Sequence, residues 1–209
     1  MRQQVTMLII TLGISHGSMA VAQTIDRTAC NAPANPNVMI ANCTAFIQSE
    51  HGTTDDLSTA YNNRGDAYYQ NGNSDRAIQD FDQAIRLNPN YAEAFGNRGS
   101  AYYQKGNYDR AIQDFDQAIR LDPNDAEMYN NRATAYYQKG ITDRAIQDFS
   151  QAISLDPNFA YALFNRGELY LTKQDCARAM QDLDKAKQLN RKFSIPPDTV
   201  ASCVSTPEP

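Results

Sequence analysis

The segment RAIQDFDQAIRL occurs at Arg76–Leu87 and again, unchanged, at Arg110–Leu121. It returns at Arg144–Leu155 with only two substitutions. Each copy begins 34 residues after the one before, an interval that indicates a tandem array of supersecondary units. Starting the register at residue 58 predicts four units, at 58–91, 92–125, 126–159 and 160–193.

Each unit carries the pattern of two amphipathic helices separated by a turn. In the second unit, Gly106 divides two stripes whose apolar residues recur at intervals of three and four. An isolated helix pair cannot bury such stripes, so neighbouring pairs must stack. We therefore predict an all-α protein, an α-solenoid of four stacked helix pairs. The two stripes consist of Phe95, Gly99 and Tyr102, and of Ala111, Phe115 and Ala118.

These residues and their interval resemble the tetratricopeptide repeat (TPR) family, whose signature positions the second unit matches from Phe95 to Pro123. The resemblance covers about two thirds of the chain and implies a non-catalytic interaction module. The fourth unit departs most, with Gln174 for the turn glycine, Leu183 for the aromatic and Arg191 for the proline. We expect its second helix to overrun the usual end.

Every unit also has arginine at its seventh position, where the family usually has leucine, and aspartate at its twenty-third. We predict that the arginine of a first helix pairs with the aspartate of a nearby second helix through bidentate hydrogen bonds. The alternative is that the arginines are ligand-binding cations. The predicted pairs are Arg64 with Asp80, Arg98 with Asp114, Arg132 with Asp148, and Arg166 with Asp182.

Both ends of the array are expected to be capped. Residues 23–57 form the predicted N-terminal cap and linker. Within them, Val38–Glu50 aligns with a second-helix pattern and predicts a half-repeat, and His51–Leu57 reads as a polar linker. Residues 194–209 are the predicted C-terminal cap and tail, with a short capping helix from Asp198 to about Val204.

Residues 1–22 have the features of a secretory signal peptide. Arg2 precedes an apolar run at Val5–Ile14, and Ala20-Val21-Ala22 supplies a small-residue cleavage pattern. The run is shorter than a membrane span, which argues against the alternative of an N-terminal anchor. The prediction is a periplasmic or secreted protein without stable membrane insertion of the mature chain.

The cysteines fit an oxidising compartment, where disulfides persist. Three pairings are open, and the sequence-local one joins Cys30 to Cys43 and Cys176 to Cys203. Buried free thiols are the alternative. No C-x-x-C motif occurs, and His51 would be the single histidine of the mature chain, so we expect no metal site.

The net charge and the motifs of the chain argue against nucleic-acid binding and against catalysis. A pI near 5.0 and a formal net charge of −5 argue against nucleic acid as a partner. No glycine-rich phosphate loop or nucleophile–base arrangement is evident, so we expect neither catalysis nor a cofactor.

The resemblance implies a concave groove lined by the first helices. At the sixth position of each unit stands an asparagine, whose amide can both donate to and accept from a peptide backbone. Tyrosines and glutamines accompany it at the twelfth and thirteenth positions. The predicted groove residues are Asn63, Asn97, Asn131, Asn165, Tyr69, Tyr103, Tyr137, Gln70, Gln104 and Gln138.

Such a row predicts that the protein binds another protein as an extended peptide and acts as an adaptor or scaffold in the cell envelope. The charged residues on this face are carboxylates, among them Glu93 and Glu127. They would repel an acidic chaperone C-terminus, which is therefore not the expected ligand. Two alternatives stay open: structural self-assembly through weak self-association, and a stripe that is merely solvated.

Overall fold

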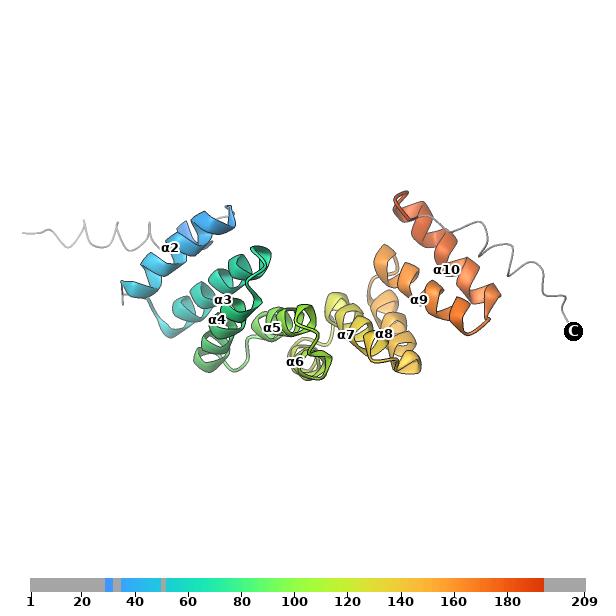
Figure 1. The fold of residues 1–209 in the computed structure, drawn as a ribbon, viewed down its shortest axis with the longest axis horizontal. Helices are drawn as coiled ribbons and strands as arrows, with labels where there is room; N and C mark the ends of the chain where they lie inside the picture. Colours follow the sequence, from blue (N-terminus) through green and yellow to red (C-terminus); the bar gives the residue numbers. More distant parts are fainter. Residues whose placement is uncertain (1–28, 32–34, 50–51, 194–209) are drawn as a thin grey trace, which may run out of the picture.

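The computed structural model describes residues 29–31, 35–49 and 52–193, and those residues contain helices and no strands. The helices succeed one another along the chain with short turns between them (Figure 1). Their bounds are α2 Pro36–Gln48, α3 Thr54–Gln70, α4 Ser74–Leu87, α5 Ala92–Gln104, α6 Tyr108–Leu121, α7 Ala126–Gln138, α8 Thr142–Leu155, α9 Ala160–Thr172 and α10 Cys176–Leu189.

The helices pack as consecutive antiparallel pairs, α3 with α4 through α9 with α10, and each pair packs on the next. The stack curves, so that α2–α4 and α9–α10 form two arms at the ends of the curve (Figure 1). Between the arms, α5 lies on the inner side of the curve and α6 lies on the outer side. The predicted all-α solenoid of stacked helix pairs is confirmed.

The cores repeat because the apolar positions repeat. Each second helix buries one large side chain against the first helix of its own pair: Phe81, Phe115, Phe149 and Leu183, all at most 1% exposed. Small residues face them. A Cβ built on Gly99 would lie 2.8 Å from the Phe115 ring, so this close approach favours glycine. The third unit accommodates Ala133 at the equivalent position.

The units end in a recurring turn that does not depend on proline. In the fourth unit, the Asn190 side chain accepts a hydrogen bond of 3.1 Å from the backbone N–H of Lys192, and its carbonyl accepts one from Phe193. Asn88 makes the same two bonds in the first unit. Because this turn persists without proline, α10 ends at Leu189, and the expected overrun of the last helix is wrong.

The N-terminal boundary also differs from expectation. The helix α3 begins at Thr54, so the predicted polar linker through Leu57 is wrong for residues 54–57. Thr53 and Asp56 form a capping box that nucleates the helix at this point. His51 and the predicted segments 1–22 and 194–209 lie outside the described residues.

The helix α2 occupies the place of a second helix in front of the first unit. Its Thr44 accepts a 3.1 Å hydrogen bond from Arg64, just as Asp82 of α4 accepts one from Arg98 in the next unit. Its Asn37 likewise accepts from Asn71 at 2.9 Å. The half-repeat therefore uses the same contact positions as a complete unit.

Candidate functional site

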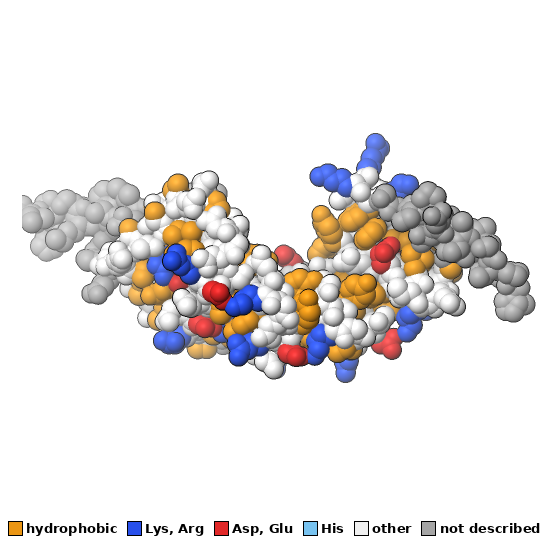
Figure 2. Space-filling view, in the orientation of Figure 1, with side chains coloured by type: hydrophobic (Ala, Val, Ile, Leu, Met, Phe, Trp, Pro, Cys, Tyr) orange, Lys and Arg blue, Asp and Glu red, His pale blue; other side chains and the backbone are white. Residues whose placement is uncertain are grey.

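Three successive first helices enclose an open hollow of about 200 Å³ on the inner side of the stack. Helix α3 contributes a tyrosine, α5 a serine and a tyrosine, and α7 an asparagine and a threonine, while a ring from α6 lies beneath. The space-filling view shows the indentation between the two arms (Figure 2). The lining residues are Tyr69, Ser100, Tyr103, Phe115, Asn131 and Thr134.

The four predicted asparagines are not equivalent. Asn63 donates to the Asn31 side chain at 3.0 Å and to the Cys30 carbonyl at 3.5 Å, so the N-terminal segment already engages its amide. Asn97 donates to Asn62 of the preceding unit at 3.1 Å. Much of the first half of the predicted row is therefore committed to contacts within the protein.

The other two asparagines lie farther along the stack. Asn131 lines the hollow, and its side-chain oxygen accepts a 3.2 Å bond from Asn130. Asn165 is half-buried on α9, beyond the hollow. Asn131 is thus the one predicted asparagine that lines the hollow.

The three predicted tyrosines are not equivalent either. Tyr69 and Tyr103 are half-buried in the hollow, and burial raises the pKa of both phenols above its usual value. Tyr137 is 48% exposed and lies outside the lining. Two of the three predicted tyrosines therefore present an apolar ring with a neutral hydroxyl to the hollow.

The predicted glutamines lie near the edge of the inner face. The side-chain interaction with Gln138 lowers the pKa of Tyr103 and so acts against the effect of burial. Gln70 donates to Asp66 at 2.7 Å, and Gln104 accepts from Ser74 at 2.6 Å across the boundary between two units. They support neighbouring side chains, and none of them lines the hollow.

Three lining residues were absent from the predicted set. Ser100 and Thr134 stand at the ninth position of their units, which belongs to the same helical stripe as the asparagines. The spacing of that stripe therefore places them beside the asparagines. Phe115 was assigned to the core only, and its contribution to the lining depends on how α6 packs beneath α5 and α7.

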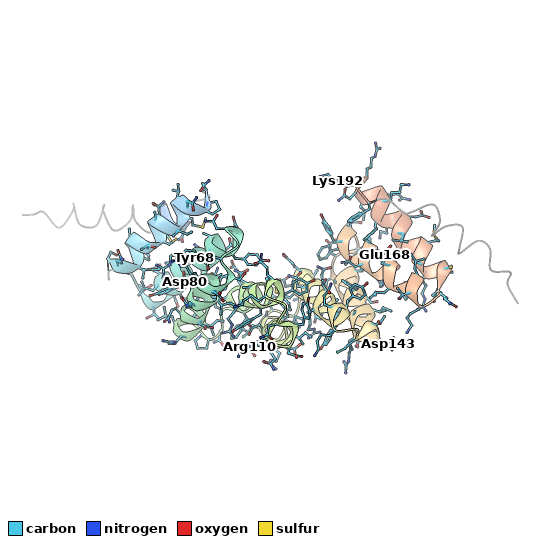
Figure 3. All side chains as sticks on the ribbon, in the orientation of Figure 1. Tyr68, Asp80, Arg110, Asp143, Glu168 and Lys192 are labelled. Carbon is cyan, nitrogen blue, oxygen red and sulfur yellow. A yellow bond between two sulfur atoms is a disulfide. The ribbon has the colours of Figure 1, made fainter. Side chains whose placement is uncertain are left out.

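Each seventh-position arginine is bidentate to the aspartate of its own pair. Arg98 donates from Nε and Nη2 to Asp114 at 2.8 and 2.7 Å, and the other three pairs have distances of 2.7 to 2.8 Å. The aspartates are 5 to 6% exposed. Figure 3 shows one of them, Asp80, beside α3 and α4. These arginines are engaged within the stack.

The electrostatics of a pair reflect its burial. Burial raises the pKa of Asp114, and the hydrogen bonds from Arg98 act in the opposite direction. Burial by itself lowers the pKa of Arg98, but the hydrogen bonds and negative charges of Asp114 and Asp82 together more than offset this and raise it. The guanidinium is charged at any ordinary pH.

A disulfide joins Cys30 to Cys43 and ties the N-terminal segment to α2. Both cysteines are buried at 0 to 1% exposure, next to Phe46 and Ala60. Cys203, the predicted partner of Cys176, lies outside the described residues.

The described residues include no group of three or more His, Cys, Asp and Glu side chains that could hold a metal ion. In the same part of the chain, every helix is too short or too polar to cross a bilayer.

Sequence profiles described as "Tetratricopeptide repeat" match residues 62–126, 115–147 and 160–193, and one described as "TPR repeat" matches 134–174. Together they run without a gap from residue 62 to residue 193. The chain belongs to the tetratricopeptide repeat family. Among curated protein sequences, none matches this TPR chain.

Solved structures share the TPR fold at low sequence identity. "MamA 41-end from Desulfovibrio magneticus RS-1" is 21% identical with a TM-score of 0.70, covering 87% of this chain and all of that one (100%). YrrB, described as "a TPR protein with an unusual peptide-binding site", is 18% identical with a TM-score of 0.66, covering 92% and 99%. The "First TPR of Spaghetti (RPAP3) bound to HSP90 peptide SRMEEVD" is 21% identical with a TM-score of 0.56, covering 57% and 94%.

Proposed function

We propose that this protein is a non-catalytic interaction module that binds an extended polypeptide along the inner face of its TPR stack. The observation that carries the proposal is the hollow shared by α3, α5 and α7, since its hydroxyl and amide groups can both donate and accept hydrogen bonds. Tyr69 and Tyr103 add apolar contact area beside them. Structures of similar fold that have a peptide-binding site or a bound peptide support this use of the fold.

The charge of the inner face favours a neutral or mildly basic ligand in this region. Glu93 and Glu127 belong to the first turns of α5 and α7, and Asp66 of α3 accepts a hydrogen bond from Gln70. A carboxylate lying over the hollow would be repelled by these groups. The lining holds no lysine or arginine that would attract it.

We further propose that the protein works in the cell envelope or outside the cell. The predicted signal peptide and the Cys30–Cys43 disulfide support this location, because such bonds persist in oxidising compartments. Fractionation of cells followed by thiol labelling tests it. Recovery of the protein in the cytoplasm with both thiols reduced would contradict the proposal.

Panning of a displayed library of random peptides tests the binding function. Peptides enriched on the wild-type protein are expected to bind the Asn131→Ala/Thr134→Ala variant about tenfold more weakly, the loss expected when two hydrogen-bonding groups of the lining are removed. The matched control, Gln79→Ala/Gln113→Ala, removes two exposed amides from α4 and α6 and should bind as wild type does. Melting temperatures verify that both variants fold.

Two results would refute the inner face as the binding surface. One is the absence of any enriched peptide, and the other is equal binding by the inner-face variant and the control. Sedimentation velocity over a range of concentrations addresses the alternative of self-assembly. A concentration-dependent oligomer, with no peptide enriched, would favour that alternative.

A further inference from the structure

The fourth unit departs from the other three at positions that the fold brings together. Its second and fifth positions are aromatic, where the earlier units have Thr or Glu and Asn or Gly. Its last three residues are Arg-Lys-Phe, where the earlier units have Pro-Asn followed by Tyr, Asp or Phe. We call the resulting surface the aromatic–basic rim; it consists of Tyr161, Phe164, Arg191, Lys192 and Phe193.

The three rings of the rim pack on one another. Phe164 stacks on Phe193 with centroids 4.6 Å apart and planes inclined by 13°, and Tyr161 meets Phe193 edge-on at 5.1 Å. Tyr161 nevertheless remains 59% exposed, among the largest exposures of an apolar side chain in the described residues. A rigid aromatic platform with one open side is a suitable surface for an apolar side chain of a ligand.

The turn at the end of α10 fixes the two basic residues beside this platform. Asn190 holds the backbone of both Lys192 and Phe193, so the ring and the adjacent cations are positioned by the same turn. Figure 3 places Lys192 at the tip of the arm formed by α9 and α10, and Figure 2 shows Lys and Arg side chains there above a group of hydrophobic side chains.

The fourth unit also has a net positive charge, whereas the other three units have a net negative charge. The fourth unit contains seven basic and four acidic residues, whereas each earlier unit contains more acidic than basic ones. Arg166, Lys173 and Arg178 of this unit form ion pairs. Arg191 and Lys192 are exposed, and neither forms an ion pair with a carboxylate of the described residues.

We propose that the aromatic–basic rim is a specificity site for an acidic segment that carries an aromatic or large aliphatic side chain. The apolar side chain lies against Tyr161 and Phe193, and the neighbouring carboxylates meet Arg191 and Lys192. This inference rests on the proposed function, since the segment belongs to the same extended polypeptide whose neutral or basic part lies over the hollow. The ligand class is therefore a peptide of uneven charge, with its acidic end over the fourth unit.

Fluorescence anisotropy with three synthetic peptides tests the proposal. All three share a neutral Asn-, Ser- and Tyr-containing body taken from the panning and about ten residues long, enough to span roughly 33 Å when extended. One ends in Phe-Asp-Glu-Asp, one in Phe-Lys-Arg-Lys and one in Ser-Asn-Gln-Asn. The acidic–aromatic peptide is expected to bind wild-type protein about tenfold more tightly than the neutral one, with the gain reduced at high salt.

Variants that give the fourth unit the residues of the third unit isolate the rim. Tyr161→Glu/Phe164→Asn and Arg191→Pro/Lys192→Asn should each remove most of the gain from the acidic–aromatic end. Binding of the neutral peptide should stay unchanged. The matched control is Arg120→Gln/Arg144→Gln, which removes two exposed positive charges from α6 and α8 and should preserve the gain. Arg191→Ser/Lys192→Asn provides a second charge variant if the introduced proline disturbs folding.

The outcomes separate the two proposals. If all three peptides bind equally and Asn131→Ala/Thr134→Ala weakens them all, the inner-face function stands and the rim proposal is overturned. Preference for the basic end, or an equal loss in the Arg120→Gln/Arg144→Gln control, also overturns it. Self-association of the wild-type chain that the rim variants abolish, without any effect on the peptides, would assign the rim to a second copy instead.

Discussion

Arg98 of α5 donates a 2.6 Å hydrogen bond to Asp82 of α4, across the boundary between the first and second units. The same guanidinium is bidentate to Asp114 of its own pair. One arginine therefore joins three helices, and Arg132 repeats the arrangement with Asp116 and Asp148. At the two ends a hydroxyl replaces the second carboxylate: Thr44 accepts from Arg64 and Ser150 accepts from Arg166. The arginines thus set how each pair sits on the previous one.

Arg98→Ala should destabilise the protein by about 3–5 kcal/mol, because it leaves Asp114 buried without its cationic partner. Thermal and urea unfolding measure the loss. The control, Arg120→Ala, removes an exposed arginine and should change stability by less than about 0.5 kcal/mol. Equal losses in the two variants would show that the buried pair has no special role.

Tyr91 gives the protein a defined sensitivity to alkaline pH. Burial, followed by the charge of Glu93, raises the pKa of Tyr91 to about 12. A phenol whose pKa is higher in the folded than in the unfolded state contributes stability that is fully present below pH 10 and lost as pH rises toward 12. Between pH 9 and pH 12, the measured free energy of unfolding should fall less steeply with pH for Tyr91→Phe than for wild type. Parallel curves would contradict this assignment.

Gln174→Gly should stabilise the protein. Gln174 stands at the turn between α9 and α10 with φ of 60°, where the other units use glycine at φ of 73 to 76°. A side chain in the left-handed region costs about 1–2 kcal/mol, partly offset by the greater backbone entropy of glycine in the unfolded chain. We expect a net gain of about 0.5–1 kcal/mol by thermal unfolding. The converse change, Gly106→Gln, should destabilise, and a loss in Gln174→Gly would refute the argument.

Replacing Cys30 and Cys43 by serine should lower stability by about 3 kcal/mol, the value expected for closure of a short loop. The N-terminal segment would then lose its covalent tie to α2, and its hydrogen bonds to Asn63 should weaken. Hydrogen exchange is expected to rise at residues 29–31 and in α2, while α7–α10 keep their protection. Uniform loss of protection along the stack would instead indicate that the cap controls the stability of the whole solenoid.

The sequence predicted most of the fold because each unit repeats nearly the same residues, and because the spacing within a unit is enough to locate its two helices. The interval of RAIQDFDQAIRL located the units, and helical spacing within each unit located the helix pairs. Capping chemistry explains the two boundary errors. The Thr53–Asp56 capping box starts α3 four residues before the repeat register, and the Asn190 turn stops α10 where proline is missing.

The candidate site was harder to predict because it depends on packing between units. The sequence placed Asn63, Asn97 and Asn131 in one row, but their partners come from different elements: the N-terminal segment, the preceding first helix and the same helix. Which of these asparagine amides stay accessible depends on the angle between neighbouring helix pairs and on the length of the connection before α3.

By itself, then, the sequence determined the helical pairs, their number and the pairing of arginine with aspartate, since these follow from short-range spacing. The tertiary structure decided that each arginine also reaches the preceding second helix, that the N-terminal segment engages Asn63, and that Tyr161, Phe164 and Phe193 meet. The contacts of Asn63 and of the three rings join residues about 30 apart, and those of the arginines join two units whose relative angle no local pattern specifies. Their geometry comes from the close packing of one pair against the next.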